Sequence, residues 1–553
     1  MEHEAEIAGI ISIDHLNPEE YEHVKCLIAE HSDIFHIPGE YLGKTSAVTH
    51  KIPTTDQRPI HVKQYRYPPI HKEEIDRQMK ELLESDIVSP STSPYNSPLL
   101  IVPKKSDEQG KKKWRMVIDY RSLNEKTIAD AYPLQSIVEI LDQLGSAKYF
   151  STFDLASGFH QIVADQDAPK TAFSTPYGHY QFNRMPFGLR NAPSTFQRLM
   201  DSVLSGLQGN EMFVYLDDIV IYASSMTEHN IKFRKLADRL RRANLKLQPD
   251  KCEFLRTEVA YLGHVIGHDG VKPDPRNVEA VRAFPVPKTT KNIKQFLGLA
   301  GYYRRFIPKF SHIAKPLTTL LKKDAKFEWR TEQERSFNTL KEMLCTEPIL
   351  QYPDFTKPFI VTTDASGHAV GAVLSQGKIG RDLPIAYASR LLNATESNYA
   401  VIEKECLAIM YVVQHFRPYL YGREFTLVTD HRPLVWMHNV KDPSSRLVRW
   451  RLKLAEFEYR VIYKEGKANM NTDALSRNPV RIFPLNADSD SSDDCALFAP
   501  PRARCSGQAV TRTPTSPTTK ILPPTPSPRP PTPTPACNDL PDLPQAPPDD
   551  LSY

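Results

Sequence analysis

The stretch FVYLDDIVIYA, from Phe213 to Ala223, places two adjacent carboxylates in the middle of an otherwise apolar and aromatic segment. Two β-type runs flank Asp217 and Asp218, and this pattern predicts a hairpin with the two aspartates at its turn. Side chains at a turn can address one point in space, whereas neighbours in a continuous strand point to opposite faces. Converging carboxylates need a cation, and their hard oxygen ligands favour Mg²⁺ or Mn²⁺. The alternative is an ordinary Asp-rich turn with exposed side chains.

A third carboxylate follows another β-type run. The segment YFSTFDLASGFHQI, from Tyr149 to Ile162, places Asp154 at the end of that run. One aspartate on a strand and two on a hairpin can hold two divalent ions about 4 Å apart. Two ions in this arrangement stabilise the attacking and the leaving oxygen of a displacement at phosphorus. The three aspartates therefore favour nucleotidyl transfer.

A second set of acidic side chains lies nearer the C-terminus. From residue 359 the pattern predicts three strands, a helix, a strand, a helix and a strand. Asp364 ends the first strand, Asp430 ends the fourth and Asp473 follows the last. Glu405 falls on the apolar face of the first helix, where a carboxylate is costly unless it is paired or metal-bound. A buried salt bridge is the alternative reading of Glu405.

Four motifs in the N-terminal half resemble the reverse transcriptase of gypsy-type LTR retrotransposons. They are KWRMVIDYRSLN, FDLASGFHQI, MPFGLRNAPSTFQRLMD and YLDD, in the order typical of that family. The resemblance implies a right hand of fingers, palm and thumb, in which Asp154, Asp217 and Asp218 hold the metal ions. It also implies that Phe159 is the steric gate that excludes the 2′-hydroxyl of a ribonucleotide. Phe187 in MPFG is usual for this family, whereas other families have Gln there.

The same resemblance assigns contacts with the nucleotide and the primer. Arg115 in KKKWRMV matches the arginine of the fingers that grips the incoming triphosphate. Lys104 or Lys105 in VPKK matches the lysine partner of that arginine. Leu262 and Gly263 in YLGHVI match the hairpin that holds the primer end.

The C-terminal acids resemble the ribonuclease H of the same retrotransposons. The matching motifs are TDAS, EKECLAI, TDHRPL and NTDALSR. The resemblance implies that Asp364, Glu405, Asp430 and Asp473 bind two metal ions. It implies that water attacks the phosphodiester of RNA within an RNA·DNA hybrid.

A chain of 553 residues is too long for one ordinary core, and we predict a multidomain α+β and α/β protein. In the basic helical region after the palm, Arg304 and Arg305 lie among aromatic residues, which suits hybrid binding as well as it suits a packing helix. The predicted parts are an N-terminal extension (1–75), reverse transcriptase fingers and palm (76–267), a thumb- or connection-like helical region (268–350), a ribonuclease H-like mixed-sheet domain (355–480) and a disordered tail, acidic and then Pro-rich (481–553).

The bulk composition limits the partners. The net charge of +4 permits a nucleic-acid partner. No apolar run approaches the ~20 residues of a membrane helix, so no membrane partner is expected. The seven cysteines include no CxxC pair, which favours a reducing compartment, and we expect a cytoplasmic, intracellular protein, in virus-like particles if the element forms them. The resemblance implies an RNA template, a DNA primer, an RNA·DNA hybrid and dNTPs as partners, with protease and integrase as Pol products encoded outside this chain.

We therefore predict an RNA-directed DNA polymerase with ribonuclease H activity and two Mg²⁺ or Mn²⁺ ions in each site. Two alternatives stay open. One is a catalytically inactive, element-derived nucleic-acid-binding protein. The other is an RNA-dependent RNA polymerase, against which Phe159 and the ribonuclease H-like region speak.

Overall fold

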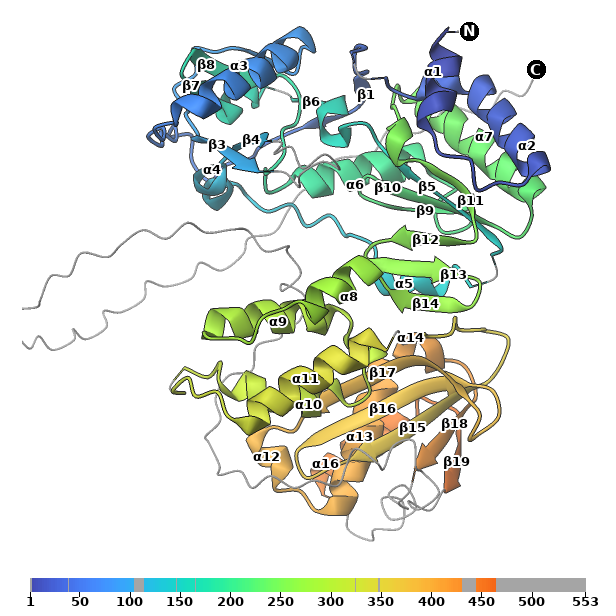
Figure 1. Ribbon diagram of the computed structural model, residues 1–553. Coiled ribbons are helices and arrows are strands. Elements are labelled where there is room, and N and C mark those ends of the chain that lie inside the picture. The colour runs from blue at the N-terminus through green and yellow to red at the C-terminus, as the bar shows by residue number, and fades with distance from the viewer. Residues whose placement is uncertain are drawn as a thin grey trace, which may run out of the picture. The chain divides into compact units, whose positions relative to one another are not determined.

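The segments that carry the first three aspartates meet in one antiparallel sheet (Figure 1). The structure is a computed structural model, and it describes residues 2–37, 39–103, 114–145, 147–164, 166–323, 325–346, 349–429 and 444–463. The strands of this palm sheet, in spatial order, are β11 (Glu253–Arg256), β5 (Tyr149–Asp154), β10 (Asp218–Ala223) and β9 (Met212–Tyr215). Consecutive residues of the central strands are buried, such as Ile219, Val220 and Ile221 of β10, so both faces of the sheet are covered.

One face of the palm sheet packs against two amphipathic helices. Phe153 and Ile221 of the sheet share a core with Phe196 and Phe233 of the helices. The second helix begins at a cap, because the Ser225 side chain accepts a hydrogen bond from the Glu228 amide. These two helices are α6 (Ala192–Val203) and α7 (Met226–Arg242), whereas α5 (Ile137–Asp142) packs on the opposite face of the sheet. Burial of apolar side chains on one face of each helix holds this layer in place.

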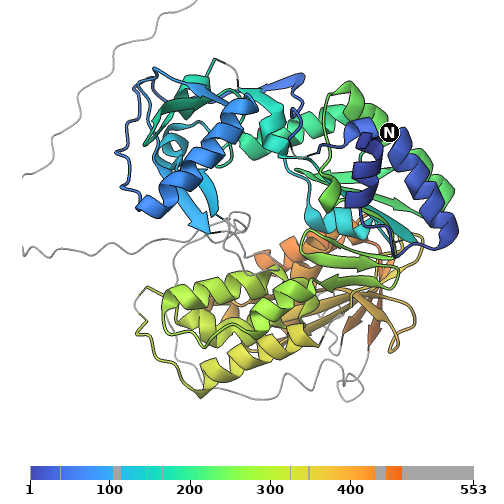
Figure 2. The same cartoon turned by 45° about the horizontal axis from the view of Figure 1, so that its top comes forward.

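The N-terminal segment is part of the same core. Its helices are α1 (Glu2–Ile10) and α2 (Pro18–Glu30), which lie beside α7 in Figures 1 and 2. Asn17 caps α2, and its side chain accepts from the Glu20 amide at 2.9 Å. Ile7, Leu27 and Phe35 are almost fully buried against palm residues. The segment therefore packs as a layer of the palm.

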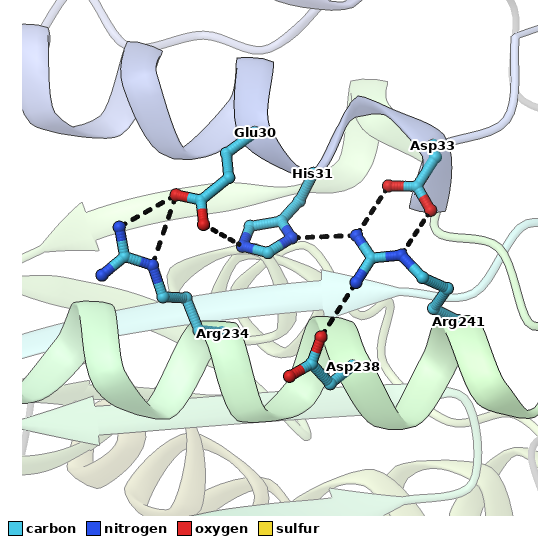
Figure 3. A network of polar contacts seen from close by, with 6 residues as sticks. All are labelled: Glu30, His31, Asp33, Arg234, Asp238 and Arg241. Carbon is cyan, nitrogen blue, oxygen red and sulfur yellow. Dashed lines mark hydrogen bonds and ion pairs between the residues drawn. The ribbon is translucent and has the colours of Figure 1, made fainter.

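Charged side chains at the end of α2 also join the N-terminal segment to α7 (Figure 3). Arg234 pairs with Glu30 at 2.9 Å, and the Arg241 Nε donates to Asp33 at 2.6 Å. The Nη2 of Arg241 donates to the Nδ1 of His31 at 3.0 Å. Because His31 is only 5% exposed, burial lowers its pKa and favours the neutral ring that accepts this bond.

The fingers consist of short strands around one long helix. The helices are α3 (Pro69–Glu84) and α4 (Arg121–Lys126). The strands form three small sheets: β2 (Val88–Pro90), β8 (Gly178–Phe182) and β7 (Phe173–Thr175); β3 (Leu99–Pro103) with β4 (Trp114–Ile118); and β1 (Thr45–His50) with β6 (Ile162–Ala164). The pairing of β1 with β6 attaches the N-terminal segment to the strand that follows Phe159 in the sequence.

The other face of the palm sheet packs on a second core. Phe150, Phe213 and Val220 of the sheet join Val259 and Phe296 there. This core includes a three-stranded antiparallel sheet of β12 (Glu258–Tyr261), β13 (His264–Gly267) and β14 (Gly270–Pro273). Its helices are α8 (Pro275–Arg282), α9 (Thr290–Tyr302), α10 (Phe310–Thr319) and α11 (Thr331–Cys345).

The C-terminal strands form a five-stranded mixed sheet with its own core. In spatial order they are β17 (Leu383–Leu391), β16 (Ala369–Gln376), β15 (Phe359–Ala365), β18 (Phe425–Thr429) and β19 (Tyr459–Tyr463). The first three strands are antiparallel, and β18 and β19 run parallel to β15. The helices here are α12 (Ala394–Ser397), α13 (Val401–His415), α14 (Arg417–Leu420) and α16 (Ser445–Leu454). The predicted order of strands and longer helices is found.

Among the residues that the structure describes, none of the helices has the length and apolar character of a membrane span.

Candidate polymerase and nuclease sites

The hairpin of the paired aspartates turns one residue earlier than predicted. Asp218 is already the first residue of β10 and pairs with Tyr215, so Leu216 and Asp217 form the turn. Leu216 has a φ of 57°, in the left-handed region that is costly for a branched side chain. Its amide donates to the Oε1 of Gln197 at 3.0 Å, and Gln197 is fully buried. A buried amide group on α6 therefore stabilises the unusual turn.

The register of the sheet brings the third aspartate next to the hairpin. Asp154 is the cross-strand partner of Asp218 on the neighbouring strand β5, and directly opposed residues have Cβ atoms about 5 Å apart. The Nζ of Lys251 pairs with the Oδ2 of Asp154 at 2.6 Å. Lys251 lies in the sequence PDK and was not predicted as a site residue. The structure thus gathers Asp154, Asp217 and Asp218 at one end of the palm sheet and adds a lysine to them.

The charges of these carboxylates interact. Burial and repulsion from Asp154 raise the pKa of Asp217. Burial and repulsion from Asp217 and Asp154 raise the pKa of Asp218 to about 6. The Asp218 side chain still reaches solvent, so we give repulsion the larger weight. Carboxylates that repel one another in this way favour a bound cation.

The predicted gate Phe159 is part of an aromatic cluster. Its ring stacks on that of Phe187 with centroids 5.1 Å apart and an interplanar angle of 27°. Phe196 of α6 packs on it with centroids 5.3 Å apart. The guanidinium carbon of Arg115, on strand β4, lies 4.9 Å from the centre of the Phe187 ring. Arg115 and Phe159 therefore contact the same ring, although they were predicted to bind different parts of a nucleotide.

The turn between β12 and β13 is held by two tyrosines. Leu262 and Gly263 both have positive φ, 48° and 72°. The Leu262 carbonyl accepts from the Tyr302 hydroxyl at 2.7 Å, and the Gly263 carbonyl accepts from the Tyr303 hydroxyl at 2.5 Å. Primer binding by this turn stays a prediction, and these contacts fix the turn on helix α9.

The two predicted hybrid-binding arginines are engaged inside the chain. Arg304 donates to the Ser389 carbonyl at 3.0 Å. Arg305 pairs with Asp142 of the palm at 3.1 Å and donates to the Ile385 carbonyl at 3.4 Å. These contacts favour the alternative of a packing segment over direct contact with a hybrid.

Of the four predicted nuclease acids, the structure describes Asp364 and Glu405. Glu405 is 2% exposed on α13, a helix that packs against β15. Asp364 lies on β15, and its Oδ2 pairs with the Nζ of Lys309 at 2.7 Å. Lys309 precedes α10 and has a φ of 55°. Helix α13 therefore carries a buried acid, and strand β15 beside it carries an acid that is already paired with a lysine.

Several predictions lie outside the described residues, namely Lys104, Lys105, Asp430, Asp473 and the Pro-rich tail. Within the described ranges, no group of three or more His, Cys, Asp and Glu side chains is already arranged to hold a metal ion. In both sites a lysine ammonium group pairs with the first acid. The donor set of carboxylate oxygens nevertheless fits a hard divalent cation.

Two family matches cover the parts that carry these sites. Residues 102–266 match the family described as reverse transcriptase (RNA-dependent DNA polymerase). Residues 354–457 match the RNase H-like domain found in reverse transcriptase. The chain is therefore similar to a reverse transcriptase over its N-terminal half and to an RNase H-like domain over the region that follows.

Relatives make the class more specific. The chain is 49% identical to the retrovirus-related Pol polyprotein from transposon 297 of Drosophila melanogaster, over 84% of this chain and 44% of that protein. It is 40% identical to the corresponding polyprotein from transposon gypsy of the same species, over 85% of this chain and 46% of that protein. The chain thus spans less than half the length of these relatives. Their similarity confirms the resemblance to gypsy-type Pol polyproteins.

A solved structure shares the fold. A foamy viral protease-reverse transcriptase in complex with dsDNA superposes with a TM-score of 0.72 at 26% identity, over 84% of this chain and 97% of that chain. This likeness confirms the predicted fold class of a right-hand polymerase with an RNase H-like domain. The exact domain boundaries stay predictions.

Proposed function

We propose that the chain is an RNA-directed DNA polymerase with ribonuclease H activity. The observation that carries the proposal is the cross-strand pairing of Asp154 with Asp218, with Asp217 in the adjoining turn. The two family matches and the Pol relatives support the same reading. Its substrates are an RNA template, a DNA primer, dNTPs and the RNA·DNA hybrid, and the dsDNA bound by the foamy viral neighbour supports a nucleic-acid partner.

Two Mg²⁺ or Mn²⁺ ions held by Asp154, Asp217 and Asp218 would supply the charge that activates the primer hydroxyl and stabilises the leaving pyrophosphate. The residues of the chain provide the rest of the site. Phe159, whose ring contacts those of Phe187 and Phe196, is the wall that excludes a 2′-hydroxyl. Arg115 offers a planar donor group to the triphosphate.

The nuclease half uses the same chemistry on RNA. Asp364 and Glu405, together with Asp430 and Asp473, are the proposed ligands of two further divalent ions. Because the Lys309 ammonium group pairs with Asp364, a cation that binds there has to displace it. We propose a cytoplasmic location, in virus-like particles with the other Pol products if the element forms such particles.

The test is primer extension on an RNA template with Mg²⁺ and dNTPs. We expect extension by the wild type and its loss in the double variant Asp217→Asn plus Asp218→Asn. Asp269→Asn, an exposed aspartate after β13, is the matched control and should extend normally. Extension by the double variant would contradict the site, and hybrid binding without extension by the wild type would favour the inactive binding protein. Cleavage of labelled RNA in a hybrid, lost in Asp364→Asn, tests the nuclease half.

A further inference from the structure

Arg184 is a buried charge on the segment between the fingers and α6. Its side chain is 1% exposed. All of its hydrogen-bond acceptors among the described residues are backbone carbonyls. A buried guanidinium is costly unless its donors are satisfied, so these carbonyls determine where the side chain and its neighbours lie.

The carbonyls belong to three separate segments. The Nη1 of Arg184 donates to Leu42 and Gly43 at 2.9 Å each, and to His160 at 3.1 Å. Longer contacts reach the carbonyls of Asp86 at 3.4 Å and Ser85 at 3.5 Å. Arg184 therefore joins the N-terminal segment, the end of helix α3 and the turn that carries Phe159.

That turn, Gly158–Gln161, is held from its other side by a second buried polar residue. Gln161 is fully buried. Its Nε2 donates to the carbonyls of Ala156 at 2.8 Å and Lys246 at 2.9 Å, and its Oε1 accepts from the Lys246 amide at 2.8 Å. His160, which follows Phe159, is thus held by Arg184. Gln161, the next residue, is held by its hydrogen bonds with Ala156 and Lys246.

Packing leaves the turn little room to move. A Cβ at Gly158 would lie 2.9 Å from the Cζ of Phe196, closer than real contacts allow. Phe196 in turn packs on Phe159. A shift of the His160 carbonyl would therefore be transmitted to the Phe159 ring.

We propose that Arg184, assisted by Gln161, is a positioning residue that fixes the Phe159 ring and so sets how strongly the site rejects a 2′-hydroxyl. The proposal rests on the proposed polymerase function and names two residues that act on its sugar specificity. Neither residue touches the nucleotide in this account. Both act through the backbone of the turn.

The experiment measures single-nucleotide incorporation on an RNA template, with dCTP and CTP as the two probes. The readout is the ratio of kcat/KM for dCTP to that for CTP, which general loss of folded protein does not change. We expect Arg184→Met to lower this ratio about tenfold, since a displacement of 1 Å in a site can change rates by about 100-fold. Arg184→Lys should restore part of the ratio, because an ammonium group can still donate to some of the carbonyls.

Tyr120→Phe is the control, because it also removes a buried hydrogen bond to a carbonyl, that of Thr171 at 2.9 Å, and Thr171 is not part of the turn Gly158–Gln161. Its ratio should equal that of the wild type. If Arg184→Met does not fold, Gln161→Met is read in the same way. A ratio that stays unchanged in the folded variant overturns the inference, while a wild type that incorporates neither nucleotide refutes the proposed function.

Discussion

Lys309 should compete with the divalent cation at the proposed nuclease site. Its Nζ pairs with the Oδ2 of Asp364 at 2.7 Å, with the two side chains 14% and 28% exposed. A partly shielded pair of this kind stabilises by about 1 kcal/mol, the upper end for ion pairs near a surface. Since 1.4 kcal/mol is a factor of ten, Lys309→Ala should tighten divalent cation binding at this site about fivefold.

The assay is a Mn²⁺ titration followed by the electron paramagnetic resonance of free Mn²⁺. The variant Asp217→Asn plus Asp218→Asn serves as the background, so that the polymerase acids do not bind the ion. Lys291→Ala, which removes an exposed lysine of α9, is the matched control and should change the Kd little. An unchanged Kd in Lys309→Ala would show that the ion pair does not oppose metal binding. A higher Kd would show that Lys309 assists metal binding. Either result would refute the reasoning.

Three further predictions concern the gate, a buried ion pair and acid stability. Phe159→Ala should lower the ratio of dCTP to CTP incorporation about 100-fold, the order of discrimination that a pocket achieves against one added hydroxyl; a ratio within twofold of wild type would contradict the gate. Arg305→Met should lower the free energy of unfolding by about 3 kcal/mol, since Asp142, with a side chain 9% exposed, loses its counter-charge. Urea unfolding measures this free energy, and a decrease below about 1 kcal/mol would contradict the prediction. Burial lowers the pKa of His50 and of His229 to about 4. The unfolded chain therefore binds protons first, and the free energy of unfolding falls as the pH drops from about 6.5 toward 4, by about 2 kcal/mol for each histidine at pH 5. Urea unfolding of His229→Gln should depend less on pH than that of the wild type, and an equal dependence would contradict the prediction.

The acids of the palm were predictable because their local patterns are strong. Asp154 ends one β-type run and Asp217 follows another, and the sheet pairs those runs in the expected way. The exact turn was not predictable. Turn rules place Gly or Asn where φ is positive, whereas the structure places Leu216 there, held by Gln197 from a distant helix.

Residues that act through long-range contacts were missed for the same physical reason. Lys251 and Lys309 each belong to segments far in sequence from the aspartates with which they pair. The local sequence pattern around a residue does not predict contacts with segments that are distant in the chain. Gln197 did leave a signal, because a fully buried amide on the apolar face of a helix needs a partner. The docking of the N-terminal helices likewise depends on distant pairs such as Arg241 with Asp33.

The central claim is that the fold gathers Asp154, Asp217 and Asp218 around a divalent cation. The most direct measurement is the anomalous scattering of Mn²⁺ in a crystal of the protein with a primer on an RNA template and a dNTP. We expect Mn²⁺ about 2.1 Å from carboxylate oxygens of Asp154 and Asp218, with the Lys251 ammonium group displaced from Asp154. Mn²⁺ bound only elsewhere, with Lys251 still paired to Asp154, would contradict it.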